Sequence, residues 1–217
     1  MTAAQALLLD VGVVLFKSAW ECADDFEDAR GLPRGTIPGR GPLDMTIPDP
    51  AWARYQADEI TERDYWMAYA KAAVDNGVDI TGYDSFMQAI FREPGVDGLW
   101  SEALALMAEC KLAGRTLGIL SNELMSFQGR DWVEAQDWYA DFAVIIDSTE
   151  LGVRKPDPRP YEAALEALGM PADAVVFIDD NPTYVEAGRR AGMRSVWLDV
   201  LDPAAAFEAA AIELGLR

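Results

Sequence analysis

Five short apolar runs recur along the chain, and each has the length and character of a buried β-strand. They occupy residues 6–10, 115–120, 142–146, 174–178 and 195–198. Their apolar character is continuous rather than alternating, which is typical of strands in a parallel sheet that is covered on both faces. The runs therefore predict the central strands of one sheet.

Helical patterns separate the later runs. Residues 160–168 end before Gly169, and residues 182–191 begin with Asn181 as the expected N-cap and Pro182 at the first helical position. Strands that alternate with helices indicate an α/β fold. We therefore expect a Rossmann-like parallel sheet with helices on both faces.

About a hundred residues separate the first apolar run from the second, far more than a simple crossover between parallel strands needs. Residues 61–76 carry the clearest helical pattern in this insertion, and a Gly- and Pro-rich loop occupies residues 31–50. We expect residues 17–95 to form a helical cap domain inserted after the first strand. Residues 1–16 and 96–217 would form the α/β core domain.

Composition and charge limit the classes of partner. A hydrophobic fraction of 51% and a charged fraction of 25% are those of an ordinary soluble globular protein. The formal net charge of −19 argues against nucleic acid and against anionic membranes. Cys22 and Cys110 fit no disulfide or metal spacing. A cytoplasmic protein is therefore expected, and the sequence leaves open whether it is a monomer or a homodimer.

The chain contains no histidine. Catalysis by Ser-His-Asp or Cys-His groups is therefore excluded, and so is a zinc or iron site with histidine ligands. Nucleophilic or acid–base chemistry has to come from Asp, Glu, Lys, Ser, Tyr or Cys side chains.

Polar residues follow the predicted strands at their carboxyl ends, which is where open parallel sheets bind ligands. Three carboxylates, a hydroxyl, a carboxamide and an ammonium stand there: Asp10, Asp179, Asp180, Ser121, Asn122 and Lys155. Clustered carboxylates repel one another unless a cation compensates. A few oxygen ligands near a lysine suit Mg²⁺ with an anionic substrate. The pattern predicts phosphoryl chemistry.

Four ordered segments resemble the motifs of the haloacid dehalogenase superfamily. They are Leu-Leu-Leu-Asp at 7–10, Ile-Leu-Ser-Asn at 119–122, Gly-Val-Arg-Lys-Pro at 152–156 and Phe-Ile-Asp-Asp-Asn at 177–181. The residues of the last two motifs are similar to those of one branch of the superfamily, which holds sugar-1-phosphate phosphatases and the phosphatase domain of epoxide hydrolases. The insertion after the first motif resembles the helical cap of that branch.

The resemblance implies a role for each motif residue. Asp10 would be the nucleophile and would form an aspartyl-phosphate. The ligands of a Mg²⁺ cofactor would be Asp10, the carbonyl of Gly12, Asp179 and Asp180. Ser121, the amide of Asn122 and Lys155 would hold the phosphate, with Ser121 and Lys155 also serving catalysis.

Two further assignments complete the expected site. Asp180 would hold Lys155 in place. Arg34 and Arg40 in the 31–50 loop are the best candidates in the cap for an anion contact, although each could also be an exposed loop charge. The expected partner is a small phosphorylated molecule such as a sugar phosphate.

Position 12 departs from the superfamily pattern, because most phosphatases carry a second Asp there as general acid and base. A positioned general acid is worth about 10²–10⁴ in rate. Gly12 leaves three alternatives open. The substrate has a good leaving group, or the protein is a 2-haloacid dehalogenase with Asp10 as nucleophile, or it is a weak catalyst that serves as a binding or accessory protein.

Overall fold

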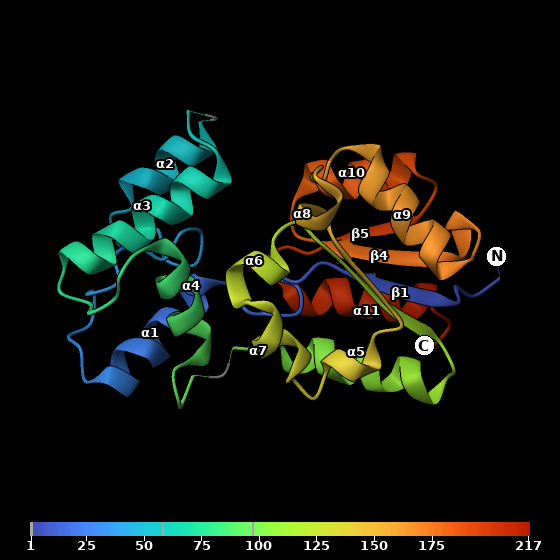
Figure 1. Cartoon of the computed structure of the whole chain (residues 1–217), viewed down its shortest axis with the longest axis horizontal. Helices are drawn as coiled ribbons and strands as arrows, with labels where there is room; N and C mark the ends of the chain where they lie inside the picture. The colour runs from blue at the N-terminus through green and yellow to red at the C-terminus, as the bar shows by residue number, and fades with distance from the viewer. Residues whose placement is uncertain (1, 58, 97) are drawn as a thin grey trace. The chain divides into compact units, whose positions relative to one another are not determined.

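The computed structural model describes residues 2–57, 59–96 and 98–217. The chain divides into two compact units (Figure 1). The α/β unit comprises the chain up to Phe16 together with Leu99–Arg217, and the helical unit comprises Lys17–Gly98. Phe16 and Leu99, which flank the insertion, form an isolated antiparallel bridge, so the α/β unit is closed where the chain leaves it.

The α/β unit is built on a five-stranded, all-parallel sheet in the order β3-β2-β1-β4-β5. The strands are β1 (Ala6–Leu9), β2 (Thr116–Ser121), β3 (Val144–Asp147), β4 (Val175–Asp179) and β5 (Arg194–Trp197). Each coincides with one predicted apolar run, with ends displaced by one or two residues. The predicted Rossmann-like α/β fold is confirmed.

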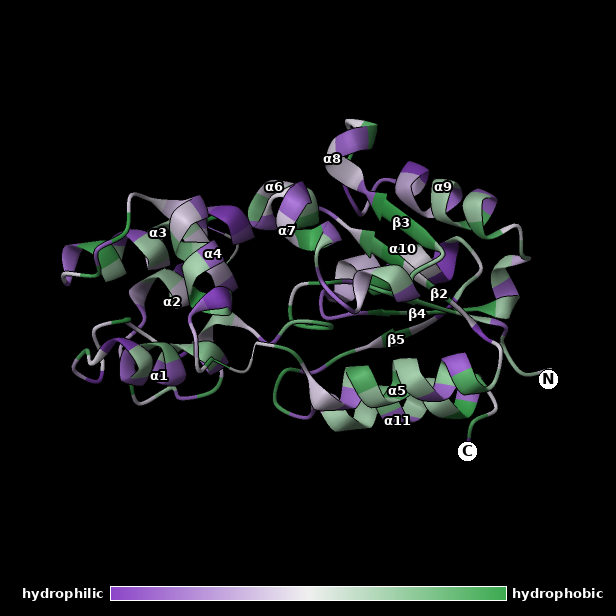
Figure 2. Ribbon diagram, turned by 60° about the horizontal axis from the view of Figure 1, so that its bottom comes forward, coloured by the Kyte–Doolittle hydropathy of each residue, from purple (hydrophilic) through white to green (hydrophobic). Residues whose placement is uncertain are grey.

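Helices cover both faces of the sheet. On one face α9 (Pro158–Leu168) and α10 (Pro182–Arg190) pack, and on the other α5 (Ser101–Leu112) and α11 (Pro203–Glu213) lie side by side (Figure 2). The predicted cap of α10 is present, because the Asn181 side chain accepts a hydrogen bond from Thr183 N. The shorter elements are α6 (Leu124–Gln128), α7 (Arg130–Glu134), α8 (Ser148–Leu151), η1 (Tyr139–Asp141) and η2 (Ala172–Ala174).

The central strand β1 is fully buried and lies between β2 and β4. From β1 the chain continues to β2 and β3 on one side of the sheet, and then to β4 and β5 on the other. This reversal of strand order is a topological switch point, and in such sheets ligands bind at the carboxyl ends of the strands beside it. Those ends belong to β1, β2 and β4.

The helical unit contains α1 (Ala19–Arg30), α2 (Pro50–Gln56), α3 (Glu62–Asp75) and α4 (Tyr83–Arg92). Its core is rich in aromatic rings, among which Trp20 and Tyr65 are buried. Gly41 has a left-handed backbone, with φ of 48°, and a Cβ there would lie 2.4 Å from the Trp20 ring. Only glycine therefore fits at this position. In the residues that the structure describes, no helix has the length and apolar character needed to cross a bilayer.

Candidate active site

Asp10 lies directly after β1, at the carboxyl end of the central strand. Its backbone N–H donates to the carbonyl of Ile178 at 2.9 Å, which extends the pairing of β1 with β4 by one residue. The side chain is 13% exposed. The strand pairing thus fixes the backbone of Asp10 while its carboxylate keeps access to solvent.

The ammonium of Lys155 bridges two carboxylates. Its Nζ donates to Asp10 Oδ1 at 2.8 Å and to Asp179 Oδ2 at 2.6 Å, and its side chain is 1% exposed. Burial alone would lower the pKa of Lys155, but the two carboxylates outweigh it and raise that pKa above its usual range. The rings of Phe177 and Tyr184 lie 5.6 and 5.1 Å from Nζ. Lys155 therefore carries a permanent positive charge within the acidic group.

Asp179 ends β4 and is fully buried. Its Oδ1 accepts a hydrogen bond from Asn181 N at 2.9 Å, while its Oδ2 accepts from Lys155. Burial raises the pKa of the Asp179 carboxyl to about 7, against the opposing effect of the Lys155 ammonium. Because burial disfavours the charged form of Asp179, a further cation beside it would stabilise that form.

Three carboxylates meet at this edge of the sheet. One oxygen each of Asp10, Asp179 and Asp180 lies within 4.8 Å of the others, in a spacing that fits a metal ion. All three donors are oxygens, which is the set that Mg²⁺ prefers. Gly12 follows Asp10 by two residues, and a Cβ at Gly12 would have Asp10 Oδ2 as its nearest neighbour at 4.0 Å. The donor set fits the expected Mg²⁺ site.

Ser121 ends β2 beside these groups, and Asn122 follows it directly. Ser121 is buried, and its Oγ accepts a hydrogen bond from Glu123 N at 3.3 Å. The Asn122 carboxamide pairs with both backbone groups of Lys155: Lys155 N donates to Oδ1 at 2.8 Å, and Nδ2 donates to Lys155 O at 3.3 Å. The side chain of Asn122 thus holds the backbone from which the Lys155 ammonium reaches the carboxylates.

The expected role of Asp180, which is to hold Lys155 in place, stays a prediction. Two carboxylates bind the Lys155 ammonium directly, those of Asp10 and Asp179. Asp180 contributes a carboxylate to the acidic group, and its carbonyl accepts a hydrogen bond from Trp197 Nε1 at 2.8 Å.

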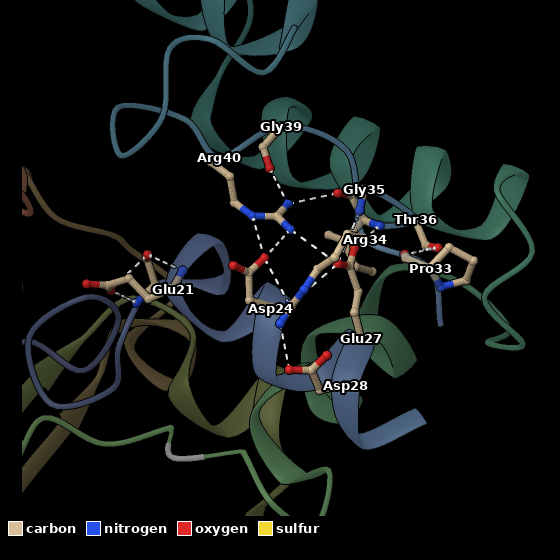
Figure 3. A network of polar contacts seen from close by, with 12 residues as sticks. Glu21, Asp24, Glu27, Asp28, Pro33, Arg34, Gly35, Thr36, Gly39 and Arg40 are labelled. Atoms are coloured by element: carbon tan, nitrogen blue, oxygen red, sulfur yellow. Dashed lines mark hydrogen bonds and ion pairs between the residues drawn. The ribbon is translucent and has the colours of Figure 1, made fainter. Parts of the chain in front are cut away.

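Arg40 belongs to the helical unit, where its guanidinium is buried and donates to Asp24 Oδ1 at 2.6 Å and to the carbonyls of Ile37 and Gly39 at 2.8 and 2.6 Å (Figure 3). The buried carboxylate of Glu27 lies 3.5 Å away. These contacts hold Arg40 to its own loop and to α1, so it is not an exposed loop charge. Its expected contact with a substrate anion stays a prediction.

Sequence reasoning missed one buried polar residue at this edge. Asp147 ends β3, in register with Ser121, and is 2% exposed. The signal was available, since an aspartate directly follows the apolar run 142–146 just as Asp10 ends the run 6–10. Its contacts are described below.

The chain is similar in sequence to a family model and to several known proteins. A family model described as haloacid dehalogenase-like hydrolase matches residues 40–192, which includes Ser121, Lys155 and Asp179 but not Asp10. Phosphoserine phosphatase of Thermus thermophilus is 30% identical over 155 residues, which cover 68% of this chain and 62% of that protein. Phosphatase MT3486 of Mycobacterium tuberculosis is 32% identical over 100 residues, 46% of each chain. The chain thus matches less than two thirds of the length of these curated relatives.

The fold also has solved counterparts. The HAD-hydrolase YfnB of Bacillus subtilis, whose structure is described as bound to magnesium, has a TM-score of 0.62 with 17% identity. The match covers 98% of this chain and 99% of YfnB. At that identity the likeness concerns the fold alone.

Proposed function

Because the chain belongs to the haloacid dehalogenase-like hydrolases, we propose that it is a Mg²⁺-dependent phosphatase that acts on a small phosphate ester through Asp10. The observation that carries the proposal is the position of the Lys155 ammonium between Asp10 and Asp179, with Asp180 completing the acidic group. This arrangement combines a partly exposed nucleophile, a fixed positive charge and a set of metal ligands. Metal-assisted phosphoryl transfer to a carboxylate uses all three.

Two observations favour a phosphatase over a 2-haloacid dehalogenase. The curated relatives at 30% and 32% identity carry the names of phosphatases. In addition, halide displacement by Asp10 would not require two more carboxylates at the same point, whereas a metal-assisted phosphoryl transfer uses them. Without a metal ion, the mutual repulsion of the three carboxylates would destabilise the site and serve no purpose in the reaction.

In the proposed reaction an Asp10 oxygen attacks phosphorus, a phosphorus–oxygen bond forms, and the bond to the leaving oxygen breaks. Water then attacks the aspartyl-phosphate, which releases inorganic phosphate and restores the carboxylate. Lys155 compensates the charge of the nucleophile and of the phosphate. The Ser121 hydroxyl and the Asn122 backbone amide bind non-bridging oxygens of the phosphate.

The ligands for Mg²⁺ would be Asp10, Asp179, Asp180 and the carbonyl of Gly12, and the ion would neutralise charge on the phosphate oxygens. Since Gly12 offers no side-chain acid, the leaving oxygen departs as an anion or takes its proton from water. Substrates with stable leaving groups, such as acyl phosphates or anomeric sugar phosphates, therefore suit this site best.

We also propose that the helical unit acts as a cap that selects the substrate, with residues 17–95 as the inserted domain. Cys22 and Cys110 are buried and form no disulfide, which suits a reducing cytoplasm.

A panel of phosphate esters tests the proposal. Acetyl phosphate and 4-nitrophenyl phosphate should release phosphate only with Mg²⁺, and Asp10→Asn should abolish the release. If no ester turns over but 2-chloropropionate yields chloride without metal, the protein is a dehalogenase. If neither reacts, yet Mg²⁺ with beryllium fluoride raises Tm in the wild type and not in Asp10→Asn, the site binds its ligand without turnover.

A further inference from the structure

A buried carboxylate that the proposed reaction does not use lies beside the phosphate-binding residues. Asp147 ends β3, in register with Ser121 at the end of β2. Three donors face its two oxygens. Oδ2 accepts from the backbone N–H of Met125 at 2.6 Å, and Oδ1 accepts from the backbone N–H and the hydroxyl of Thr149 at 3.0 and 2.5 Å.

The bond to Met125 fixes the start of α6 from a different strand. The first N–H groups of a helix have no partner within it, and the residue before α6, Glu123, makes no side-chain cap bond. Asp147 takes the Met125 N–H instead. Ser121 and Asn122 immediately precede the start of α6. Their position therefore depends on where Asp147 holds the Met125 N–H.

The bonds to Thr149 fix the start of the segment that leads to Lys155. Asp147 is the N-cap of α8, which ends at Leu151, four residues before Lys155. The same two segments are joined again further on, where the Asn122 carboxamide pairs with the Lys155 backbone. The ion pair of Arg154 with Glu123 joins them as well. Asp147 is thus the buried one among three side-chain connections between the Ser121 segment and the Lys155 segment.

We propose that Asp147 is a positioning residue, which sets the spacing between the Ser121 hydroxyl and the Lys155 ammonium; this rests on the proposed function, which places both groups on the phosphate. An ionised carboxylate accepts on both oxygens and so serves Met125 and Thr149 at once. A carboxamide has one accepting oxygen, so one buried N–H would lose its partner and its segment would shift.

Two replacements separate positioning from helix capping. Asp147→Asn and Asp147→Ser both keep a good N-cap for α8, but neither can also accept from Met125 N. Displacement of a catalytic group by about 1 Å costs on the order of 10²-fold. We expect both variants to lower kcat for acetyl phosphate by about 10- to 100-fold, with KM within about threefold of the wild type.

Arg115→Met is the matched control for lost stability. Arg115 precedes β2 at the opposite end of the sheet, where it donates to Gln5 Oε1 at 2.8 Å and to Leu214 O at 3.1 Å. This variant should lower Tm and leave kcat unchanged. Equal losses of kcat in Arg115→Met and Asp147→Asn would overturn the proposal, and so would wild-type kcat in Asp147→Ser.

Amide hydrogen exchange supplies a readout that needs no turnover. Asp147→Asn should speed exchange at Met125 and also at Lys155, whose N–H bonds to Asn122, while Arg115→Met should leave both unchanged. Unchanged exchange at Lys155 would show that Asp147 does not act on that segment. If the wild type hydrolyses no phosphate ester, the proposed function fails, whereas the exchange result still decides whether Asp147 connects the two segments.

Discussion

Lys155 and Asp179 form a buried ion pair with 2.6 Å between Nζ and Oδ2, although 24 residues separate them in the chain. The Lys155 side chain is 1% exposed and that of Asp179 is 0% exposed. Removal of one partner from such a pair leaves an uncompensated buried charge, which is far more costly than the loss of a surface pair.

Lys155→Met should therefore destabilise the protein by about 3–5 kcal/mol. The free energy of unfolding in urea measures this, and added Mg²⁺ should recover part of the loss because the carboxylates remain together. Lys71→Met is the control, since Lys71 pairs with Asp75 on the exposed surface of α3 and its loss should cost about 0.5 kcal/mol or less. Equal losses in the two variants would contradict a buried charge pair.

Gly12→Asp should restore a general acid. The nearest atom to a Cβ at Gly12 is Asp10 Oδ2 at 4.0 Å, so the new side chain meets no steric obstacle at its base. We expect rates to rise by up to about 10²-fold for alkyl phosphates and much less for acetyl phosphate, whose leaving group needs no proton. The slope of log kcat/KM against leaving-group pKa measures the difference.

Gly12→Asn is the control, because it matches the size of Asp without an acidic proton. A uniform gain or loss across the leaving-group series with Gly12→Asp would show that a missing acid does not limit the reaction.

Asp157 should contribute stability that depends on pH. Its carboxylate caps α9 and accepts from the side chain of Arg159 at 2.8 Å, and these bonds lower the pKa of Asp157 to about 2. Since the folded pKa lies below the unfolded value of about 3.9, the contribution is complete above pH 4 and is lost as the pH falls towards 2.

Asp157→Asn keeps the helix cap and removes the charge, so Tm measured against pH isolates this contribution. The variant should melt below the wild type at pH 6, and the two curves should converge near pH 2. A difference in Tm that stays constant over this range would contradict the assignment.

Arg40 and Glu27 should show strong energetic coupling. Glu27 is fully buried and also accepts from Ile37 N at 2.7 Å, so it holds the 31–50 loop together with Arg40. Arg40→Met should cost about 3–5 kcal/mol because it removes the nearer and more buried of the two guanidinium groups beside the Glu27 charge, the other being that of Arg34 at 3.8 Å. In a double-mutant cycle with Glu27→Gln, the two losses should not add.

Additive losses in that cycle would mean that Glu27 and Arg40 stabilise the loop independently. Tm and urea unfolding of the two single variants and the double variant decide this without any measurement of activity.

Sequence predicted the sheet well, since each strand is a run of apolar residues that the fold buries on both faces. The sequence also predicted that Asp10 and Asp179 lie close together, because their strands were expected to end at the same edge of the sheet. These predictions needed only periodicity and the geometry of a parallel sheet.

What sequence could not predict depends on contacts between distant segments. Arg40 was predicted to be an anion contact or an exposed loop charge, and its burial was not foreseen. Its partners, Asp24 and Glu27, lie on a helix whose orientation the pattern did not reveal. Asp147 was overlooked because an aspartate before a short helix is ordinarily only a cap. Its second bond, to Met125, exists because β2 and β3 are neighbours.

The closure of the α/β unit at Phe16 and Leu99 has an evolutionary consequence. Trp100 N donates to Leu15 O at 3.1 Å and the Trp100 indole donates to Val13 O at 2.8 Å, so the chain departs and returns at one point. A tight turn could replace everything in between without moving a strand. Inserts of any size can thus be exchanged there while the carboxylates and the lysine stay where they are, so new specificities can arise without redesign of the reaction centre.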